Sequence, residues 1–195
     1  MPASRLLLVA VLAVFAAPVV AQVNPFTALG RAISTTLDVR TKDEVAADAE
    51  IAAGASSRLL EDKRAEWAGV SILVFQQHVV IAGAVKGAEA KRIVEQVVRK
   101  DRRIRSLHNE LRTDDGGSLV RDTALEAEIN GSLTSASGVS SVNMRWSAVG
   151  GHVVLMGVAQ SKTEADRALE RIRDIPGVKS AKSLLRIVAP PQKKK

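Results

Sequence analysis

The chain has 195 residues, a hydrophobic content of 46% that is typical of a globular protein, and a formal net charge of +7 at pH 7. It contains no cysteine, which excludes disulfides, thiolate metal ligands and a lipid anchor attached through cysteine. A basic chain favours acidic partners such as nucleic acid, anionic lipid or an acidic polymer, and the compartment decides among them.

Residues 1–21 have the features of a secretory signal peptide. Arg5 gives a positive start, an apolar run extends from Leu6 to Ala17, and small residues occupy the −3 and −1 positions before Gln22. The run is shorter than the roughly 20 residues that a membrane-spanning helix needs. We therefore expect cleavage before Gln22 and export of the protein. An uncleaved membrane anchor is the alternative.

Residues 22–40 form a leader whose large apolar side chains recur at helical spacing. They are Phe26, Leu29, Ile33 and Leu37. This pattern predicts a short helix that packs on the first domain. A segment that lies on a membrane surface is the alternative.

The first domain is expected over residues 41–112, around an apolar strand that begins at His78 and ends at Gly83. Thr41 followed by Glu44 matches a capping box and predicts a helix start. Gln76-Gln77 separates two apolar, β-branched runs and predicts the turn of a hairpin. In order, the expected elements are a helix over 41–60, strands over 70–75 and 78–83, a helix over 87–100 and a strand over 104–111.

The same pattern recurs over residues 119–188, after a linker at 113–118 that is rich in Gly and Asp. Asp122 is the expected N-cap of the opening helix, and Pro176-Gly177 is expected to stop the next one. In order, the expected elements are a helix over 122–134, strands over 142–146 and 152–157, a helix around 165–172 and a strand over 178–188. Residues 189–195 form a basic tail.

Each domain thus has the order helix–strand–strand–helix–strand. The hairpin makes one antiparallel pair, and the right-handed strand–helix–strand crossover makes one parallel pair, so each three-stranded sheet is mixed. With both helices on one face, we expect an α+β chain of two tandem two-layer sandwiches. Gly83 and Gly157 end the repeated strands and are expected to be structural, because such a glycine marks a bulge or a close backbone approach.

The duplicated pattern resembles the BON domain family (bacterial OsmY and nodulation). The resemblance is carried by the acidic helix starts (Asp43-Glu44 and Asp122), the two strands that end in glycine, the apolar strand after each second helix, and Ile-Pro-Gly-Val at 175–178. The whole chain is similar to the exported dual-BON proteins of Gram-negative envelopes. Many of those carry a lipid-modified cysteine after the signal peptide, which this chain lacks.

The resemblance implies a periplasmic protein, peripheral to the outer membrane, that binds phospholipid and supports envelope integrity under osmotic or envelope stress. Its expected partners are anionic phospholipid and, secondarily, envelope proteins. A periplasmic protein–protein or cell-wall adaptor is the alternative function. The element order also invites comparison with RNA-binding KH modules. However, no Gly-x-x-Gly loop lies between helices, and export removes the substrate, so we expect no nucleic-acid binding.

Residues suited to catalysis are not recognisable in the sequence. Catalytic and nucleotide-binding motifs are absent, and the three histidines suggest no nucleophile–base pair. Two of them, His78 and His152, occupy equivalent repeat positions, which argues against a shared metal site. We therefore expect no enzyme activity, cofactor or metal.

Apolar residues of the second domain's opening helix are the first candidates for contact with a membrane or a partner. Leu119, Val120 and Ala124 fall off the stripe of core residues on this helix. Trp146 is a weaker candidate of the same kind. Packing of these side chains against the first domain is the alternative.

A basic turn before the last strand of the first domain is the second candidate. It contains Arg99, Lys100, Arg102, Arg103 and Arg105. Near an anionic surface each of these contributes on the order of 1 kcal/mol. The corresponding turn of the second domain, 173–179, is far less basic, so the two domains are not expected to be equivalent partners. A solubilising loop is the alternative.

Overall fold

The computed structural model describes residues 38–65, 68–114 and 117–188. Over these residues the chain forms four α-helices, one short 3-10 helix and six strands. Their bounds are α1 Lys42–Glu61, β1 Val70–Phe75, β2 His78–Ala84, α2 Ala88–Val98, β3 Ser106–Arg112, α3 Leu119–Ser135, η1 Ser141–Asn143, β4 Met144–Val149, β5 His152–Ala159, α4 Lys162–Arg173 and β6 Ser180–Ile187. The expected signal peptide, most of the leader and the basic tail lie outside the described residues.

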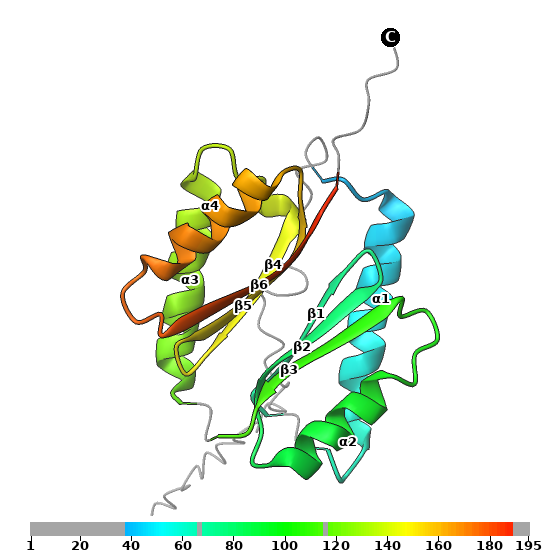
Figure 1. Ribbon diagram of the computed structural model, residues 1–195. Coiled ribbons are helices and arrows are strands. Elements are labelled where there is room, and N and C mark those ends of the chain that lie inside the picture. The colour runs from blue at the N-terminus through cyan, green and yellow to red at the C-terminus, as the bar shows by residue number, and fades with distance from the viewer. Residues whose placement is uncertain (1–37, 66–67, 115–116, 189–195) are drawn as a thin grey trace, which may run out of the picture.

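The two repeats have the same topology. β1 pairs antiparallel with β2, which pairs parallel with β3, and β4, β5 and β6 repeat this arrangement. α1 and α2 cover one face of the first sheet, and α3 and α4 cover one face of the second (Figure 1). The predicted fold class, two tandem α+β sandwiches that each have a mixed three-stranded sheet, is confirmed.

The two opening helices begin differently. At α1 the predicted capping box is present: Glu44 N donates to Thr41 Oγ1 at 3.2 Å, and Thr41 N donates to the Glu44 carboxylate at 2.8 Å. α3 begins earlier than expected, with Ser118 at its N-cap, so the prediction that Asp122 caps this helix is wrong. Asp122 is buried, and its carboxylate accepts a hydrogen bond from Gly150 N. Asp122 therefore stabilises the hairpin turn of its repeat.

Each repeat has its own hydrophobic core between helices and sheet. The first core includes Ile51, Leu59, Val79, Ile81, Val94 and Val98. The second includes Leu125, Ile129, Leu133, Leu155, Ala168 and Ile172. Because successive side chains of a strand point to opposite faces, Val79 and Ile81 point into the first core and Val80 points to the other face of the sheet.

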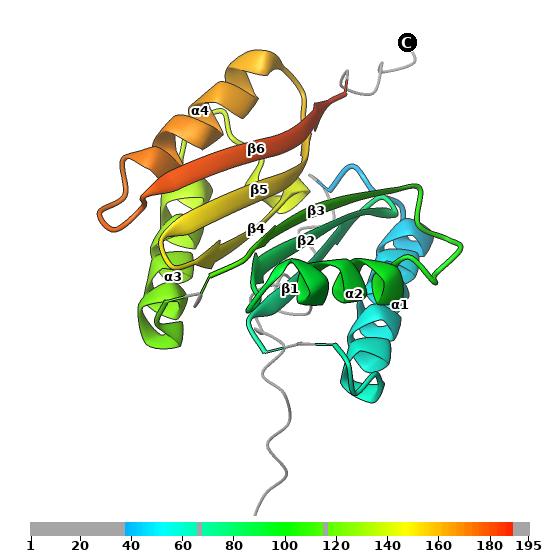
Figure 2. The same ribbon diagram turned by 60° about the horizontal axis from the view of Figure 1, so that its bottom comes forward.

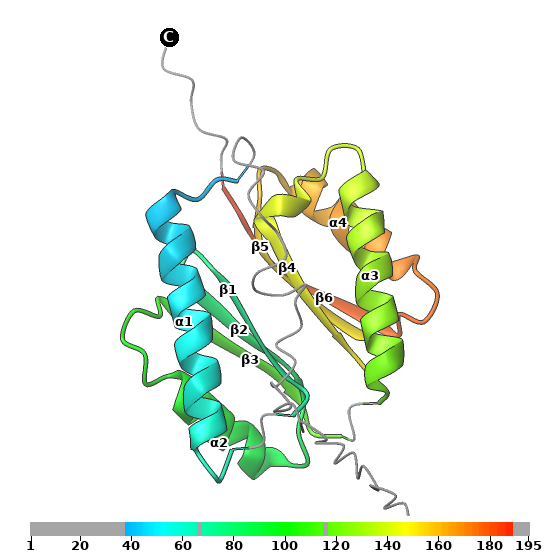
Figure 3. The ribbon, with the colours of Figure 1, turned by 180° about the vertical axis from the view of Figure 1, so that it is seen from behind.

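The faces of the two sheets that no helix covers pack against each other. Figures 1 and 3 show the sheets facing each other in the middle of the molecule, with the helices outside. A third apolar cluster lies between them, with Leu73, Phe75 and Val80 from the first repeat and Met156 and Val158 from the second. This contact between the sheets was not predicted from the sequence. The described molecule is therefore a helix–sheet–sheet–helix stack in which each repeat covers the open sheet face of the other.

Gly83 and Gly157 occupy the same place in β2 and β5, with φ of 122° and 123°. A Cβ at Gly83 would collide with the carbonyl oxygen of Gly69, and one at Gly157 with that of Asn143. Residues with a side chain rarely adopt this region of φ. The structural role expected of both glycines stays a prediction, and this close backbone approach is its physical reason.

Candidate functional site

The first turn of α3 presents two large apolar side chains to solvent. Leu119 is 72% exposed and Val120 is 80% exposed, and we call them the apolar pair. Ala124, one turn further on, is also exposed. Leu125 and Ile129 of the same helix point into the second core, which leaves the other three off the core stripe. This exposure excludes the alternative in which Leu119 and Val120 pack against the first domain.

Basic side chains lie around the apolar pair. Arg121 is exposed in the same turn of α3. The hairpin turn of the second repeat packs on this helix start, because Gly150 N donates to Asp122 Oδ1 at 2.9 Å. Lys179 N donates to the carbonyl of Gly151 in that turn at 2.7 Å, which places exposed Lys179 at the same end of the repeat. An apolar tip with a basic rim is suited to an anionic interface.

Trp146 does not belong to this surface. It is 5% exposed and lies in the second core, beside Met144 and Ala148 of the same strand. The expectation that Trp146 contacts a membrane or a partner is wrong, because the two-residue alternation of β4 turns this position toward the helices.

The basic turn is exposed, but much of its charge is already compensated. Arg99 pairs with Glu95 at 2.6 Å. Arg103 pairs with Asp101 at 2.9 Å and with Glu50 of α1 at 2.6 Å, and its hydrogen bonds hold the pKa of Asp101 well below the ordinary range. These contacts fasten the turn to α1. The basic residues of the turn without an ion pair among the described residues are Lys100, Arg102 and Arg105.

The structure does not bring the two candidate groups together. The basic turn precedes Ser106, the first residue of β3, and the linker to α3 follows Arg112, the last. At about 3.3 Å per residue, this strand separates the two groups by roughly 20 Å. Figure 2 shows β3 running between them. We therefore take the apolar pair with its basic rim as the candidate site, and treat the basic turn as a separate surface.

Two open depressions lie elsewhere on the described surface. One, of about 450 Å³, is lined by Arg58, Glu61, Asp62, Lys63, Arg64 and Lys100. The other, of about 470 Å³, is lined by Ser135, Ala136, Ser137, Arg167 and Arg171. In the first, hydrogen bonds from Arg64 lower the pKa of Asp62 to about 2. Neither depression has the enclosed, largely apolar lining of a small-molecule site.

Each repeat contains a histidine–serine pair that sequence reasoning missed. His78 Nδ1 lies 2.6 Å from Ser106 Oγ, and His152 Nδ1 lies 2.7 Å from Ser180 Oγ. The histidines had suggested no such pair in the sequence, and the pairs arise because the parallel register places each serine directly opposite its histidine. Within the described residues no carboxylate hydrogen-bonds to either imidazole, so each pair reads as a cross-strand contact between strand starts.

Within residues 38–65, 68–114 and 117–188, no three His, Asp or Glu side chains are grouped so that they could hold a metal ion. No helix within these ranges is both long enough and apolar enough to cross a bilayer.

Comparison with known proteins adds a family to this geometry. The profile of the BON domain matches residues 47–115 and again residues 121–189. An uncharacterized protein in the gshII 5' region of Anaplasma centrale is 26% identical over 125 residues, and the match covers 62% of this chain and 83% of that protein. Two solved structures of CdsD, a structural protein of the type III secretion system of Chlamydia trachomatis, are also similar. The first is 16% identical with a TM-score of 0.32, and the match covers 74% of this chain and 65% of the CdsD chain. The second is 18% identical with a TM-score of 0.29, and the match covers 67% of this chain and 61% of the CdsD chain.

Proposed function

Since this chain belongs to the BON domain family and carries the domain twice, we propose that it is a non-enzymatic envelope protein that binds phospholipid membrane surfaces. The BON family suggests an envelope-associated, membrane-binding or stress-related role. It is not a family of enzymes. Our finer proposal is a periplasmic protein, peripheral to the outer membrane, that supports envelope integrity under osmotic or envelope stress. The features of a signal peptide in residues 1–21 support export.

The observation that carries this proposal is the exposed apolar pair. Burial of each aliphatic side chain contributes about 1.5 kcal/mol or more. The basic rim, Arg121 and Lys179, adds on the order of 1 kcal/mol per residue near an anionic surface. Together these contributions reach on the order of 5 kcal/mol, which corresponds to dissociation near the millimolar range. Such binding is reversible, as expected of a peripheral protein.

Vesicle flotation tests this proposal. The chain without residues 1–21 is mixed with vesicles of phosphatidylcholine alone or with added phosphatidylglycerol. We expect flotation with the anionic vesicles and its loss in the double variant Leu119→Ser, Val120→Ser. Leu60→Ser is the matched control, because Leu60 is also apolar and 49% exposed but lies on α1. Absence of flotation with every vesicle would reject lipid binding and favour the adaptor function. Loss of flotation in the control would reject the assigned site.

Charge reversal separates the two basic surfaces. Arg121→Glu with Lys179→Glu reverses the rim of the apolar pair, and Lys100→Glu with Arg102→Glu reverses two of the three residues of the basic turn that lack an ion pair among the described residues. We expect the rim variant to lose more binding at low salt, because the rim lies beside the inserted side chains. Added salt should reduce both effects, because it screens charges beyond about 10 Å. A larger loss of vesicle binding in the turn variant would show that the basic turn of the first repeat makes the main electrostatic contribution.

A further inference from the structure

Polar contacts join the two repeats around the third apolar cluster. Ser147 Oγ of β4 lies 3.0 Å from Ser71 Oγ of β1. At the other edge of the sheets, Lys182 of β6 pairs with Glu110 of β3 at 2.7 Å. The interface thus has an apolar centre and polar contacts at both edges.

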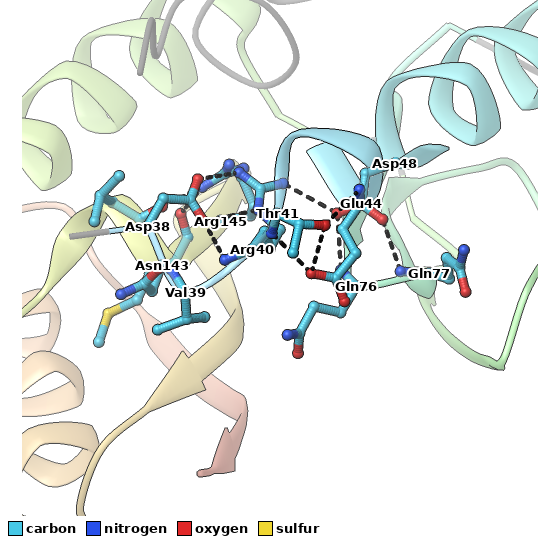
Figure 4. Close-up of polar contacts among 12 residues, drawn as sticks. Asp38, Val39, Arg40, Thr41, Glu44, Asp48, Gln76, Gln77, Asn143 and Arg145 are labelled. Carbon is cyan, nitrogen blue, oxygen red and sulfur yellow. Dashed lines mark hydrogen bonds and ion pairs between the residues drawn. The ribbon is translucent and has the colours of Figure 1, made fainter. Parts of the chain in front are cut away.

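Three residues that precede α1 lie across this interface, and we call Asp38, Val39 and Arg40 the strap (Figure 4). Val39 N donates to Oδ1 of Asn143, a residue of the second repeat that is 1% exposed, at 3.0 Å. The Val39 side chain packs against the third apolar cluster. Arg40 turns to the first repeat and pairs with Asp48 of α1 at 3.0 Å. The strap therefore contacts both repeats within two consecutive residues.

Arg40 is held from several sides. Its guanidinium pairs with Asp38 at 2.7 Å, and its side chain is 6% exposed. It lies 4.4 Å from the centre of the Phe75 ring, and the guanidinium of Arg145 from β4 lies 5.4 Å from the same centre. Burial, together with the charge of Arg40, lowers the pKa of Arg145 to about 10, and the charge of Asp38 acts in the opposite direction. A buried aromatic ring of the first repeat thus contacts one strap arginine and one arginine of the second repeat.

The strap continues into a chain of hydrogen bonds that returns to the second repeat. Besides Arg40, the Asp48 carboxylate accepts from Gln76 N at 2.8 Å and from Gln77 N at 2.7 Å. Both turn residues have positive φ, 51° and 64°, which costs roughly 1–2 kcal/mol for a residue with a side chain. Gln76 Oε1 in turn accepts from Arg186 of β6 at 2.6 Å. Strap, α1, hairpin turn and β6 are connected without a gap.

The second repeat folds without a strap of this kind. In the register that pairs Asp48 with Asp122, the position of Arg40 is taken by Asp114, an acidic residue. Asp114 pairs with Arg112, which belongs to the first repeat's own last strand. A repeat of this topology therefore does not need an arginine strap to form. Arg40 instead fixes the strap, whose Val39 contacts Asn143 of the second repeat, to Asp48 of α1.

We propose that the strap is a latch on the sheet–sheet interface: contacts of Asp38, Val39 and Arg40 keep the two repeats closed, and their release opens the interface while each repeat stays folded. Opening exposes the apolar faces of both sheets at once. Arg40 is the positioning residue of this latch, because it is the strap side chain that joins Asp38, Asp48 and Phe75.

Thiol labelling measures this opening directly, because the chain has no cysteine of its own. Ser147→Cys places a thiol at an interface position that is 1% exposed, and its labelling by a maleimide reports opening. Ala55→Cys places a thiol in the core of the first repeat, at a position that is 0% exposed, and its labelling reports unfolding of the first repeat. In the Arg40→Gln background we expect labelling at position 147 to rise about tenfold or more, since a charge-assisted network is lost. Labelling at position 55 should rise less than labelling at position 147, because loss of the pair with Asp48 destabilises the first repeat without opening its core to the same extent.

Two further variants make the experiment decisive. Arg92→Gln removes an exposed ion pair with Glu89 on α2 and should change neither labelling rate. Asp38→Asn keeps the contact between Arg40 and Asp48 and is the milder strap variant if Arg40→Gln does not fold. It should also raise labelling at position 147 selectively. Unchanged labelling at 147 in the strap variants, or an equal rise at positions 147 and 55, overturns the latch.

Discussion

The two repeats place an equivalent buried carboxylate in different surroundings. In the first, Asp48 accepts hydrogen bonds from Arg40 and from both amides of the Gln76-Gln77 turn. In the second, Asp122 accepts one from Gly150, in a turn of two glycines that adopt positive φ without strain. The hairpin turn of the first repeat thus has two glutamines with a strained backbone, and their amides bond to a buried carboxylate. The turn of the second repeat has two glycines whose backbone is not strained. The first repeat is tied into the interface, and the second leaves its helix start free for contact.

The largest expected effect tests what the repeats share. Gly83→Val and Gly157→Val should each lower the free energy of unfolding by about 3 kcal/mol or more, because both combine a positive φ with a backbone collision. Urea unfolding of each variant measures the loss. Gly131→Ala on α3 is the control, since nothing surrounds that position and alanine should raise stability by up to about 1 kcal/mol. A loss in only one repeat would show that the equivalence is superficial.

The second prediction separates the two carboxylates. Asp48→Asn should lower the free energy of unfolding by about 2–3 kcal/mol, and Asp122→Asn by about 1 kcal/mol, because Asp48 satisfies three donors, one of them charged. Thermal unfolding of both variants under identical buffer conditions gives the comparison. Equal losses would mean that the strap and the strained turn add nothing to the role of this carboxylate.

The third prediction exchanges turn residues between the repeats. Gln77→Gly should raise the free energy of unfolding by about 1 kcal/mol, because glycine adopts the observed φ of 64° without strain. The reverse exchange, Gly151→Gln, should be destabilising, since a Cβ there would lie 2.6 Å from the carbonyl oxygen of Gly177. Melting temperatures that move in the same direction in both variants would contradict the assignment of strain to the first repeat.

The smallest expected effect concerns pH. Burial, helped by the charges of Arg186 and Arg105, lowers the pKa of His78 below its ordinary value of 6.5, while Asp48 opposes this and His108 adds to it. The unfolded chain then binds the proton more tightly than the folded chain. This contribution to stability is complete above pH 6.5 and is lost as the pH falls toward the lower folded pKa.

His78→Gln should therefore flatten part of the decrease in melting temperature between about pH 7.5 and about pH 5. His152 shifts in the same direction, through burial and the charges of Arg112 and Lys179, so His152→Gln is the matched variant. Arg186 and Arg112 each belong to the repeat opposite the histidine that they affect, so both effects act partly across the interface. A flattening confined to His152→Gln would contradict this.

The sequence predicted what is local and repeated. The Thr41–Glu44 capping box, the Gln76-Gln77 turn and the order of elements follow from short-range chemistry, and the structure has them all. It did not predict the sheet–sheet contact, because an alternating strand such as β1 shows two apolar faces without showing what covers the second. The strap was missed for a related reason: its contact with the second repeat, from Val39 N to Asn143 Oδ1, joins residues 104 positions apart in the sequence.

At the candidate site the helical periodicity was informative and the strand was not. Leu119 and Val120 fall off a stripe of core residues that is long enough to define a face. Trp146 sits in a short strand, where an error in assigning the inward face reverses the result, and it proved to be buried. The partial neutralisation of the basic turn was also hidden, because Glu50, which pairs with Arg103, lies far away in the sequence.

The sequence separations of these contacts determine the order in which the molecule folds. Within each repeat the bonds from His78 to Ser106 and from His152 to Ser180 close loops of 28 residues. The contacts between repeats span 72 to 110 residues, and the strap reaches Asn143 across 104. Closing a longer loop costs more chain entropy, so short-range contacts form first and the repeats fold before they dock. Before docking, the two folded repeats expose complementary apolar sheet faces. Because a short linker joins them, the effective concentration of one repeat near the other is in the millimolar range. This favours docking within one chain over docking between two chains.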